Sequence, residues 1–155
     1  MKSKFDCSLK LRLHTHLLAL LEERIHLAKE LVQSATDARN EDTKSSAGDK
    51  YETGRAMMQQ QIDMNQVELH KAELLFNTLK ALDPVMPGER ISAGSLIYTN
   101  IGIYYIAVGI GKIDFEEQEI FVVSPAAPLA QMLMSKKQND QIHFAGKDHT
   151  VLCIC

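Results

Sequence analysis

The sequence predicts an α+β fold, in which a long N-terminal antiparallel α-helical coiled-coil hairpin is followed by a small antiparallel β-sheet domain with one short helix. Two long stretches without proline repeat apolar residues at alternating spacings of four and three, as coiled-coil helices do. The rest of the chain holds short β-branched or aromatic runs between turn residues, which is typical of strands. We therefore expect the hairpin over residues 1–83, a linker over 84–88 and the sheet domain over 89–155.

The first helix is expected from about Lys10 to Ala38, where the chain has neither proline nor glycine. Its heptad positions are Leu13, Leu17, Leu20, Arg24, Leu27, Leu31, Ser34 and Ala38. A second stripe beside them includes His14, Leu18 and Leu21, so the apolar face is wider than a two-stranded seam requires. We therefore expect this helix to pack on its hairpin partner and, near its start, on a further element.

The second helix is expected from about Gly48 to Leu82. Its heptad positions are Tyr51, Arg55, Met58, Ile62, Asn65, Leu69, Ala72, Phe76 and Leu79. When the chain is folded on itself near Thr43 to Ala47, Leu27 meets Ile62 and the polar residues Arg24 and Asn65 meet each other. A shared polar layer would fix this register, and a short connection favours antiparallel neighbours. A coiled coil between two chains stays open, because the same seam can pair intermolecularly.

The sheet domain begins after Pro84 and Pro87, because proline cannot continue the second helix. Strands are expected within residues 95–100, 104–109, 119–124, 141–145 and 150–155. A short helix is expected from Pro128 to Lys136, and turns at Asn139-Asp140 and at Gly146 to Asp148.

Composition narrows the classes of function. The net charge of −3 argues against tight, sequence-independent binding to duplex nucleic acid and suits a protein partner. No apolar run approaches the roughly 20 residues of a membrane span, and no phosphate-binding loop or nucleophile motif is visible. We expect a cytoplasmic protein with no catalytic residue, no cofactor and no metal site of its own. The odd set Cys7, Cys153 and Cys155 is expected to stay as buried free thiols.

The predicted sheet domain carries a set of short motifs in order. They are Gly94-Ser95, Tyr105 to Gly109, Ser124-Pro125, Leu129-Ala130 and Ser135 to Asp140. Together with the hairpin, this part of the chain resembles the bacterial transcript cleavage factors GreA and GreB and their relatives. The resemblance implies an FKBP-like C-terminal domain that docks on the rim of the secondary channel of RNA polymerase, while the hairpin enters the channel. Its contact with nascent RNA and DNA would be indirect.

The resemblance also implies two groups of site residues. The polymerase-binding group comprises Ser124, Pro125, Leu129, Lys136 and Lys137; solvated surface lysines are the alternative for the last two. In cleavage-active members, two carboxylates at the hairpin tip help to hold a second Mg²⁺ ion at the polymerase active site, where hard oxygen ligands position the ion and activate water. Any Mg²⁺ would thus be held only in the complex with the polymerase.

The tip of this hairpin, Asn40 to Arg55, differs from the cleavage-active pattern. An alignment on Tyr51 places Lys44, which has the wrong charge for a Mg²⁺ ligand, at an acidic position. An alignment on an acid pair selects Asp49 and Glu52 instead, and Glu41 with Asp42 is a third choice. The acids also have a local explanation, because Asp49 and Glu52 complement a helix N-terminus. Arg55 either faces channel phosphates or pairs with these acids.

We therefore expect a polymerase-binding elongation regulator, which at most stimulates RNA cleavage by the polymerase. Two alternatives stay open. One is a transcript cleavage factor whose tip carboxylates help to bind Mg²⁺, and the other is a coiled-coil adaptor unrelated to transcription. The sequence leaves the oligomeric state open.

Overall fold

The computed structural model describes residues 5–42, 49–85 and 88–155. The chain divides into two compact units, which are described separately below. The hairpin unit is Ala19–Phe76, and the sheet unit combines Met1–Leu18 with Asn77–Cys155. No helix among the described residues is long and apolar enough to cross a membrane.

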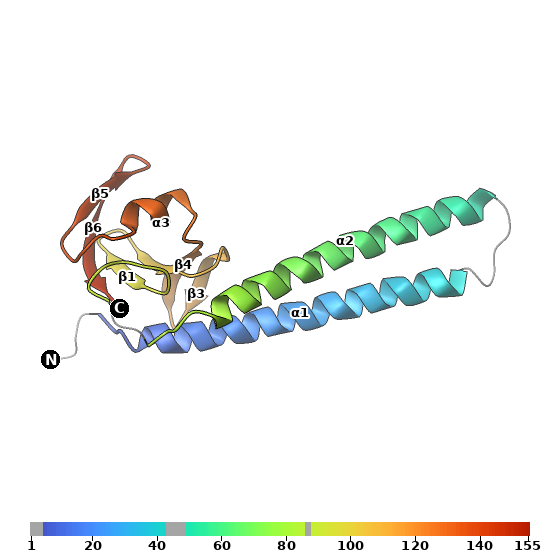
Figure 1. Cartoon of the computed structure of the whole chain (residues 1–155), viewed down its shortest axis with the longest axis horizontal. Coiled ribbons are helices and arrows are strands. Elements are labelled where there is room, and N and C mark those ends of the chain that lie inside the picture. The colour runs from blue at the N-terminus through green and yellow to red at the C-terminus, as the bar shows by residue number, and fades with distance from the viewer. Residues whose placement is uncertain (1–4, 43–48, 86–87) are drawn as a thin grey trace. The chain divides into compact units, whose positions relative to one another are not determined.

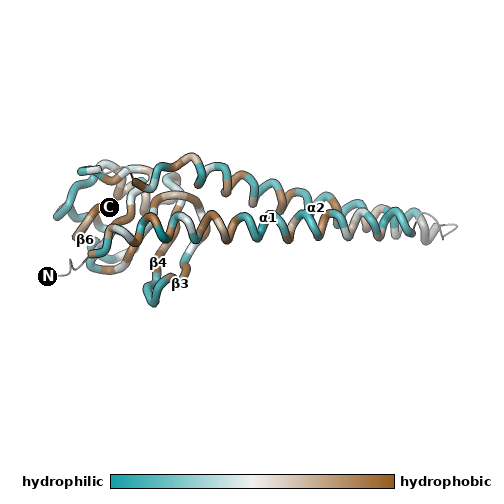
Figure 2. Tube along the Cα trace, turned by 90° about the horizontal axis from the view of Figure 1, so that it is seen from below, coloured by the Kyte–Doolittle hydropathy of each residue, from teal (hydrophilic) through white to brown (hydrophobic). Residues whose placement is uncertain are grey.

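The hairpin unit contains most of each of two long helices (Figure 1). Helix α1 runs over Leu9–Asp42 and helix α2 over Asp49–Lys80, so that each is about 50 Å long at 1.5 Å per residue. The predicted pair of long antiparallel helices is confirmed. Hydrophobic and hydrophilic residues alternate along both helices (Figure 2), as the spacing of their apolar residues predicts. The predicted turn at Thr43 to Ala47 lies outside the described residues.

The predicted register of the hairpin is wrong. The Asn65 amide donates a hydrogen bond of 3.4 Å to the Leu31 carbonyl, whereas the sequence placed Asn65 opposite Arg24. Arg24 instead lines a groove together with Lys71 and Leu75. The difference between Leu31 and Arg24 is one heptad. Because a seam that repeats every seven residues looks the same after such a shift, the apolar pattern alone does not distinguish the two registers.

Among its described residues, the sheet unit holds a six-stranded sheet in the order β3-β4-β2-β1-β6-β5 and the short helix α3. The strands are β1 Leu96–Thr99, β2 Ile103–Ile106, β3 Gly111–Phe115, β4 Gln118–Val123, β5 Gln141–Phe144 and β6 Lys147–Ile154. The helix, α3, spans Pro128–Leu133. The predicted combination of a helical hairpin, a small sheet and one short helix is therefore confirmed.

The sheet is mixed rather than purely antiparallel, because β2 and β4 pair in parallel. The reason is β3, a strand that the sequence analysis missed. It forms a hairpin with β4, and β4 takes the inner place beside β2. The two strands differ in polarity: β4 carries the buried Ile120 and Val122, while β3 carries Lys112 and Asp114. Charged side chains suit an exposed edge strand.

Two tight turns shape the sheet. Glu116 and Glu117 connect β3 to β4 with positive φ angles of 49° and 61°, and Ala145 and Gly146 do the same between β5 and β6 with angles of 52° and 75°. This geometry matches the two-residue turns that fit the twist of antiparallel strands. The second turn shares only Gly146 with the predicted turn Gly146 to Asp148, because Lys147 and Asp148 belong to β6.

Helix α3 ends at Leu133, three residues before the predicted end at Lys136. The chain after it pairs with Ile91, which lies before β1. The Ser135 amide donates to the Ile91 carbonyl at 2.8 Å, and the Ile91 amide donates to the Lys136 carbonyl at 2.9 Å. Ser135 and Lys136 thus form backbone hydrogen bonds with Ile91 and do not continue the hydrogen bonds of the helix.

The apolar core of the sheet unit has two parts. One is a cluster around α3 and the sheet, made of Ile91, Ile97, Tyr104, Ile106, Ala130, Leu133, Ile142 and Val151. The other includes the first turns of α1, where Leu9, Leu13 and Leu17 are fully buried. The expectation that α1 packs on a further element near its start is therefore confirmed.

The cysteines correct a prediction. Cys7 and Cys155 form a disulfide whose Cα atoms lie 5.3 Å apart, a spacing usual for such a bridge, and Cys153 is a half-buried free thiol. The expected set of three buried free thiols is therefore wrong. The fold brings together two residues that are 148 positions apart, a distance over which residue spacing gives no information.

Candidate functional site

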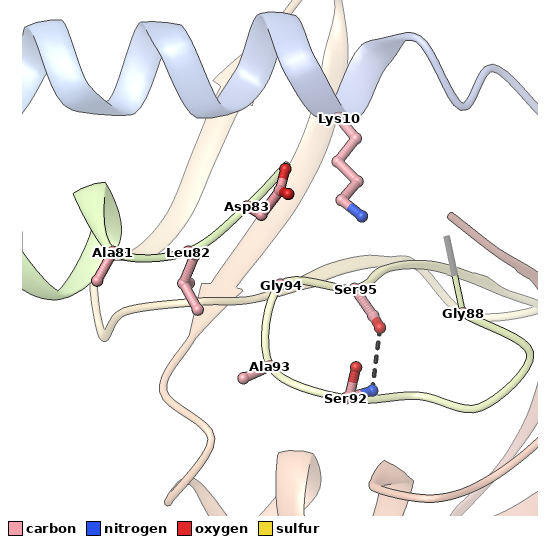
Figure 3. Close-up of a pocket in the computed structure, with 9 residues that line it drawn as sticks. All are labelled: Lys10, Ala81, Leu82, Asp83, Gly88, Ser92, Ala93, Gly94 and Ser95. Atoms are coloured by element: carbon pink, nitrogen blue, oxygen red, sulfur yellow. Dashed lines mark hydrogen bonds between the residues drawn. The ribbon is translucent and has the colours of Figure 1, made fainter. Parts of the chain in front are cut away.

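A cavity of about 290 Å³ lies in the sheet unit, between the start of α1 and the loop before β1. Figure 3 shows Lys10 and Asp83 on one side of it and the loop residues Ser92 to Ser95 on the other. The Ser92 amide donates a hydrogen bond of 3.0 Å to the Ser95 hydroxyl. The cavity thus combines an ammonium group, a carboxylate and hydroxyl groups around a small space, which suits a small polar group.

Lys10 is the unusual residue of this cavity, because it is only 4% exposed. Burial lowers the pKa of its ammonium group, and the Asp83 carboxylate opposes that shift. Lysine is almost never this buried unless it is paired. The nearby Asp83 carboxylate therefore helps to stabilise the buried ammonium group of Lys10.

One turn further along α1, His14 makes a second buried polar contact. Its Nδ1 atom lies 2.7 Å from the Tyr105 hydroxyl, and the side chains are 5% and 0% exposed. Burial lowers the pKa of His14, with a further contribution from the charge of Lys10. Burial also raises the pKa of Tyr105. Both rings therefore stay neutral at pH 7, and the hydrogen bond satisfies two groups that are removed from water.

The sequence analysis did not select Lys10, Asp83 or Tyr105 as functional residues, and it treated His14 as part of an apolar stripe. A usable signal was present. Lys10 lies three residues before the buried Leu13, and His14 lies three residues before the buried Leu17, so both fall on the core-facing side of the helix. Polar residues in such a stripe indicate a buried polar contact.

The predicted polymerase-binding residues lie along the connection from β4 through α3 to β5. Some of them have structural roles there. The Ser124 hydroxyl accepts a hydrogen bond of 3.1 Å from the Ala126 amide, and Leu129 packs against the core cluster. Pro125 and Lys136 are half-buried, whereas Lys137 is exposed, so Lys137 is the member of this group best placed to meet a partner.

The predicted tip residues are only partly within the described chain. Lys44 lies outside it, and Asp42, Asp49 and Tyr51 are described as helical backbone only. Glu41, Glu52 and Arg55 are exposed on the adjoining turns of α1 and α2. The geometry of the tip acids therefore stays a prediction.

Large apolar side chains are exposed along the hairpin unit. They are Leu27, Leu31, Met57, Met64, Val67 and Leu74. Leu27 and Leu31 line a groove of about 350 Å³ between the two helices, opposite Ala72 and Leu75. The sequence analysis placed Leu27 and Leu31 in the helix seam, whereas the structure leaves these side chains 51% and 59% exposed.

The sequence analysis did not predict that three cysteines, a residue type that binds metal ions, lie close together in the sheet unit. Cys7, Cys153 and Cys155 have sulfur atoms that all lie within 4.8 Å of one another. This cluster is taken up below.

No protein-family model matches the sequence, and neither does any curated protein sequence. Among solved structures, the chain is similar to one described as "Structure of the transcription factor Gfh1", with 17% sequence identity and a TM-score of 0.37. The match covers 88% of this chain and 92% of the other. At this level of similarity, the role of that protein is not transferred to this chain.

Proposed function

We propose that the protein is an RNA polymerase-binding regulator of transcription elongation. In this proposal the sheet unit docks on the polymerase, and the tip of the hairpin enters the secondary channel. The protein performs no chemistry itself.

The observation that carries the proposal is the exposure of large apolar side chains along the hairpin unit, including Leu27, Leu31 and Met57. Exposed apolar residues that gather over a surface are typical of sites that bind another protein. A net charge of −3 does not suit a surface that binds nucleic acid directly. A protein partner is therefore the best-supported class.

The resemblance to GreA and GreB specifies which protein partner to test. Its motif residues fall on the parts of the sheet unit that the resemblance implies: Gly94-Ser95 precedes β1, Tyr105 lies in β2, and Ser124-Pro125 leads into α3. The chain also has the implied order of a long helical hairpin followed by a small sheet domain. These points favour RNA polymerase over the partner of an unrelated adaptor.

Retention of the full chain on immobilised core RNA polymerase tests the proposal. We expect retention at about 1 µM protein, the range of a moderate protein complex. Replacing Leu27 and Leu31 by serine should weaken retention about tenfold, because central apolar contacts contribute most to an interface. Lys29→Ser is the matched control, since Lys29 is exposed on the same helix, and it should bind like the unchanged chain.

Absence of retention would overturn the proposal and favour the adaptor interpretation. A stable homodimer whose formation depends on Leu27 and Leu31 would also contradict it, because these residues would then be covered by a second copy. A second assay adds the chain to stalled elongation complexes and tests for RNA cleavage. If backtracked RNA is shortened, and if Asp49→Ala combined with Glu52→Ala abolishes the shortening, the protein is a transcript cleavage factor instead.

A further inference from the structure

The sheet unit brings all three cysteines of the chain together. Cys7 lies just before α1, Cys153 lies in β6, and Cys155 follows the last residue of that strand. The sulfur atoms of Cys153 and Cys155 are 4.0 Å apart, and Cys7 is bonded to Cys155. A disulfide needs only two of these residues. The position of the third thiol beside the bridge therefore calls for another explanation.

The spacing of the sulfur atoms fits a thiolate site for a metal ion. In a tetrahedral site with Zn–S bonds of about 2.3 Å, neighbouring sulfur atoms lie about 3.8 Å apart. The distance of 4.0 Å between Cys153 and Cys155 is close to this value, and all three sulfur atoms lie within 4.8 Å of one another. Opening the bridge lets Cys7 and Cys155 move to the same spacing by side-chain rotation.

Positive charge lies near two of the three cysteines. Cys7 lies two residues before the first residue of α1, a helix of 34 residues, and the N-terminal end of a helix carries partial positive charge. Cys7 and Cys155 line a cavity of about 250 Å³ together with Lys10, whose ammonium group is a nearby source of positive charge. Cys7 is exposed and the other two cysteines are half-buried, so an ion has access to the cluster from solvent.

We propose that the reduced chain binds one Zn²⁺ ion through Cys7, Cys153 and Cys155, with a water molecule as the fourth ligand. Thiolate sulfur is a soft ligand that selects ions such as Zn²⁺, and three protein ligands with one water is an established coordination for this ion. Binding requires that the Cys7–Cys155 bridge is open. Zinc binding and the disulfide therefore exclude each other.

The conversion between the two forms is a balanced reaction. A phosphine reductant with one water molecule converts the disulfide to two thiols and is itself oxidised to the phosphine oxide. The three thiols then release up to three protons as the ion binds, because the thiolate is the ligand.

Titration of the phosphine-reduced full chain with Co²⁺ under anaerobic conditions tests the proposal. Thiolate-bound Co²⁺ gives charge-transfer bands in the near ultraviolet and, when tetrahedral, ligand-field bands in the visible. We expect both sets of bands to saturate at about one ion per chain and to disappear when Zn²⁺ is added. The oxidised chain, with its bridge closed, should give no charge-transfer bands.

Cys153→Ser is the decisive variant, because it removes one ligand and leaves the Cys7–Cys155 bridge intact. We expect binding at least about tenfold weaker than in the unchanged chain, with the bridge still detected by thiol counting after oxidation. Thermal unfolding followed by tyrosine fluorescence shows that the variant is folded. Cys153→Ala repeats the test without a hydroxyl group.

Three results would overturn the proposal. They are the absence of charge-transfer bands in the reduced chain, unchanged binding in Cys153→Ser, and saturation at one ion per two chains. None of these results bears on polymerase retention, which depends on other residues.

Discussion

The hairpin unit and the sheet unit differ in how far they cover their large apolar residues. In the sheet unit, Leu133 is fully buried in a cluster of buried residues between α3 and the sheet. In the hairpin unit, Leu31 is 59% exposed, and five other large apolar residues of the same unit are exposed with it. Leu133 therefore contributes to the core of its unit, whereas Leu31 lies largely in solvent.

This contrast indicates how the two units divide their roles. Burial of apolar surface is the main driving force for folding, so the sheet unit has its own source of stability. Two helices alone bury less, and the exposed residues along α1 and α2 gain burial only when another surface covers them. Buried polar side chains also belong to the sheet unit, which buries Lys10, His14 and His149.

The largest effect is expected from truncating the core of the sheet unit. Leu133→Ala should lower the free energy of unfolding by about 2–5 kcal/mol, because it leaves a cavity in a close-packed cluster. Urea unfolding followed by tyrosine fluorescence measures this change, since three of the four tyrosines lie in β1 and β2.

Leu31→Ala is the matched change in the hairpin unit, and it should alter the free energy of unfolding by about 0.5 kcal/mol or less, as exposed substitutions do. The same urea experiment with far-ultraviolet circular dichroism follows the helices. Equal losses for Leu133→Ala and Leu31→Ala would show that the contrast between the two units is wrong.

An effect smaller than that of Leu133→Ala is expected from the buried hydrogen bond between His14 and Tyr105. Tyr105→Phe should cost about 1–3 kcal/mol in free energy of unfolding, because Nδ1 of His14 then lies in the core without a partner. Tyr98→Phe is the control. Its hydroxyl donates to the Asp6 carbonyl at 2.9 Å, and Asp6 is exposed, so water can replace the lost partner. A larger loss for Tyr98→Phe than for Tyr105→Phe would contradict the importance of the buried pair.

The parts of the fold that depend on local pattern could be predicted from the sequence. The helices follow from the spacing of leucines, and strands such as β4 follow from runs of β-branched residues. Strand β3 was missed although Lys112 to Phe115 alternate polar and apolar residues as a half-buried strand does, because the predicted strands are continuous β-branched or aromatic runs. The register of the hairpin could not be predicted either, since a heptad repeat permits a shift of seven residues.

The parts of the candidate sites that depend on distant contacts could not be predicted. Tyr105 lies 91 positions from His14, and Cys155 lies 148 positions from Cys7. The apolar stripe of α1 indicates that His14 faces the core, but the local pattern does not identify the residue with which His14 forms a hydrogen bond. Resemblance to a family supplied the tip acids and the residues near α3, and it gave no sign of the cysteine cluster.

The smallest expected effect is the dependence on pH of the free energy of unfolding of the sheet unit. Burial lowers the pKa values of His14 and His149 below the ordinary histidine value of 6.5. Charged groups modify these shifts: Lys10 and Asp83 act on His14, and Lys147, Asp148 and His143 act on His149. A hydrogen bond with the Phe144 backbone also acts on His149 and opposes the lowering of its pKa. Because both folded-state values are lowered, the unfolded chain binds more protons once the pH falls below about 6.5.

The free energy of unfolding of the sheet unit should therefore be highest above pH 6.5 and should decrease as the pH falls towards the folded-state pKa values. Carboxyl groups titrate mainly below about pH 5, so the interval from pH 7 to pH 5 isolates the histidines. Urea unfolding followed by tyrosine fluorescence at several pH values in this interval measures the slope. The double variant His14→Gln with His149→Gln should give a flatter curve, because glutamine keeps hydrogen-bonding capacity without titrating. If the slope of the double variant equals that of the unchanged chain, the buried histidines do not cause the acid sensitivity.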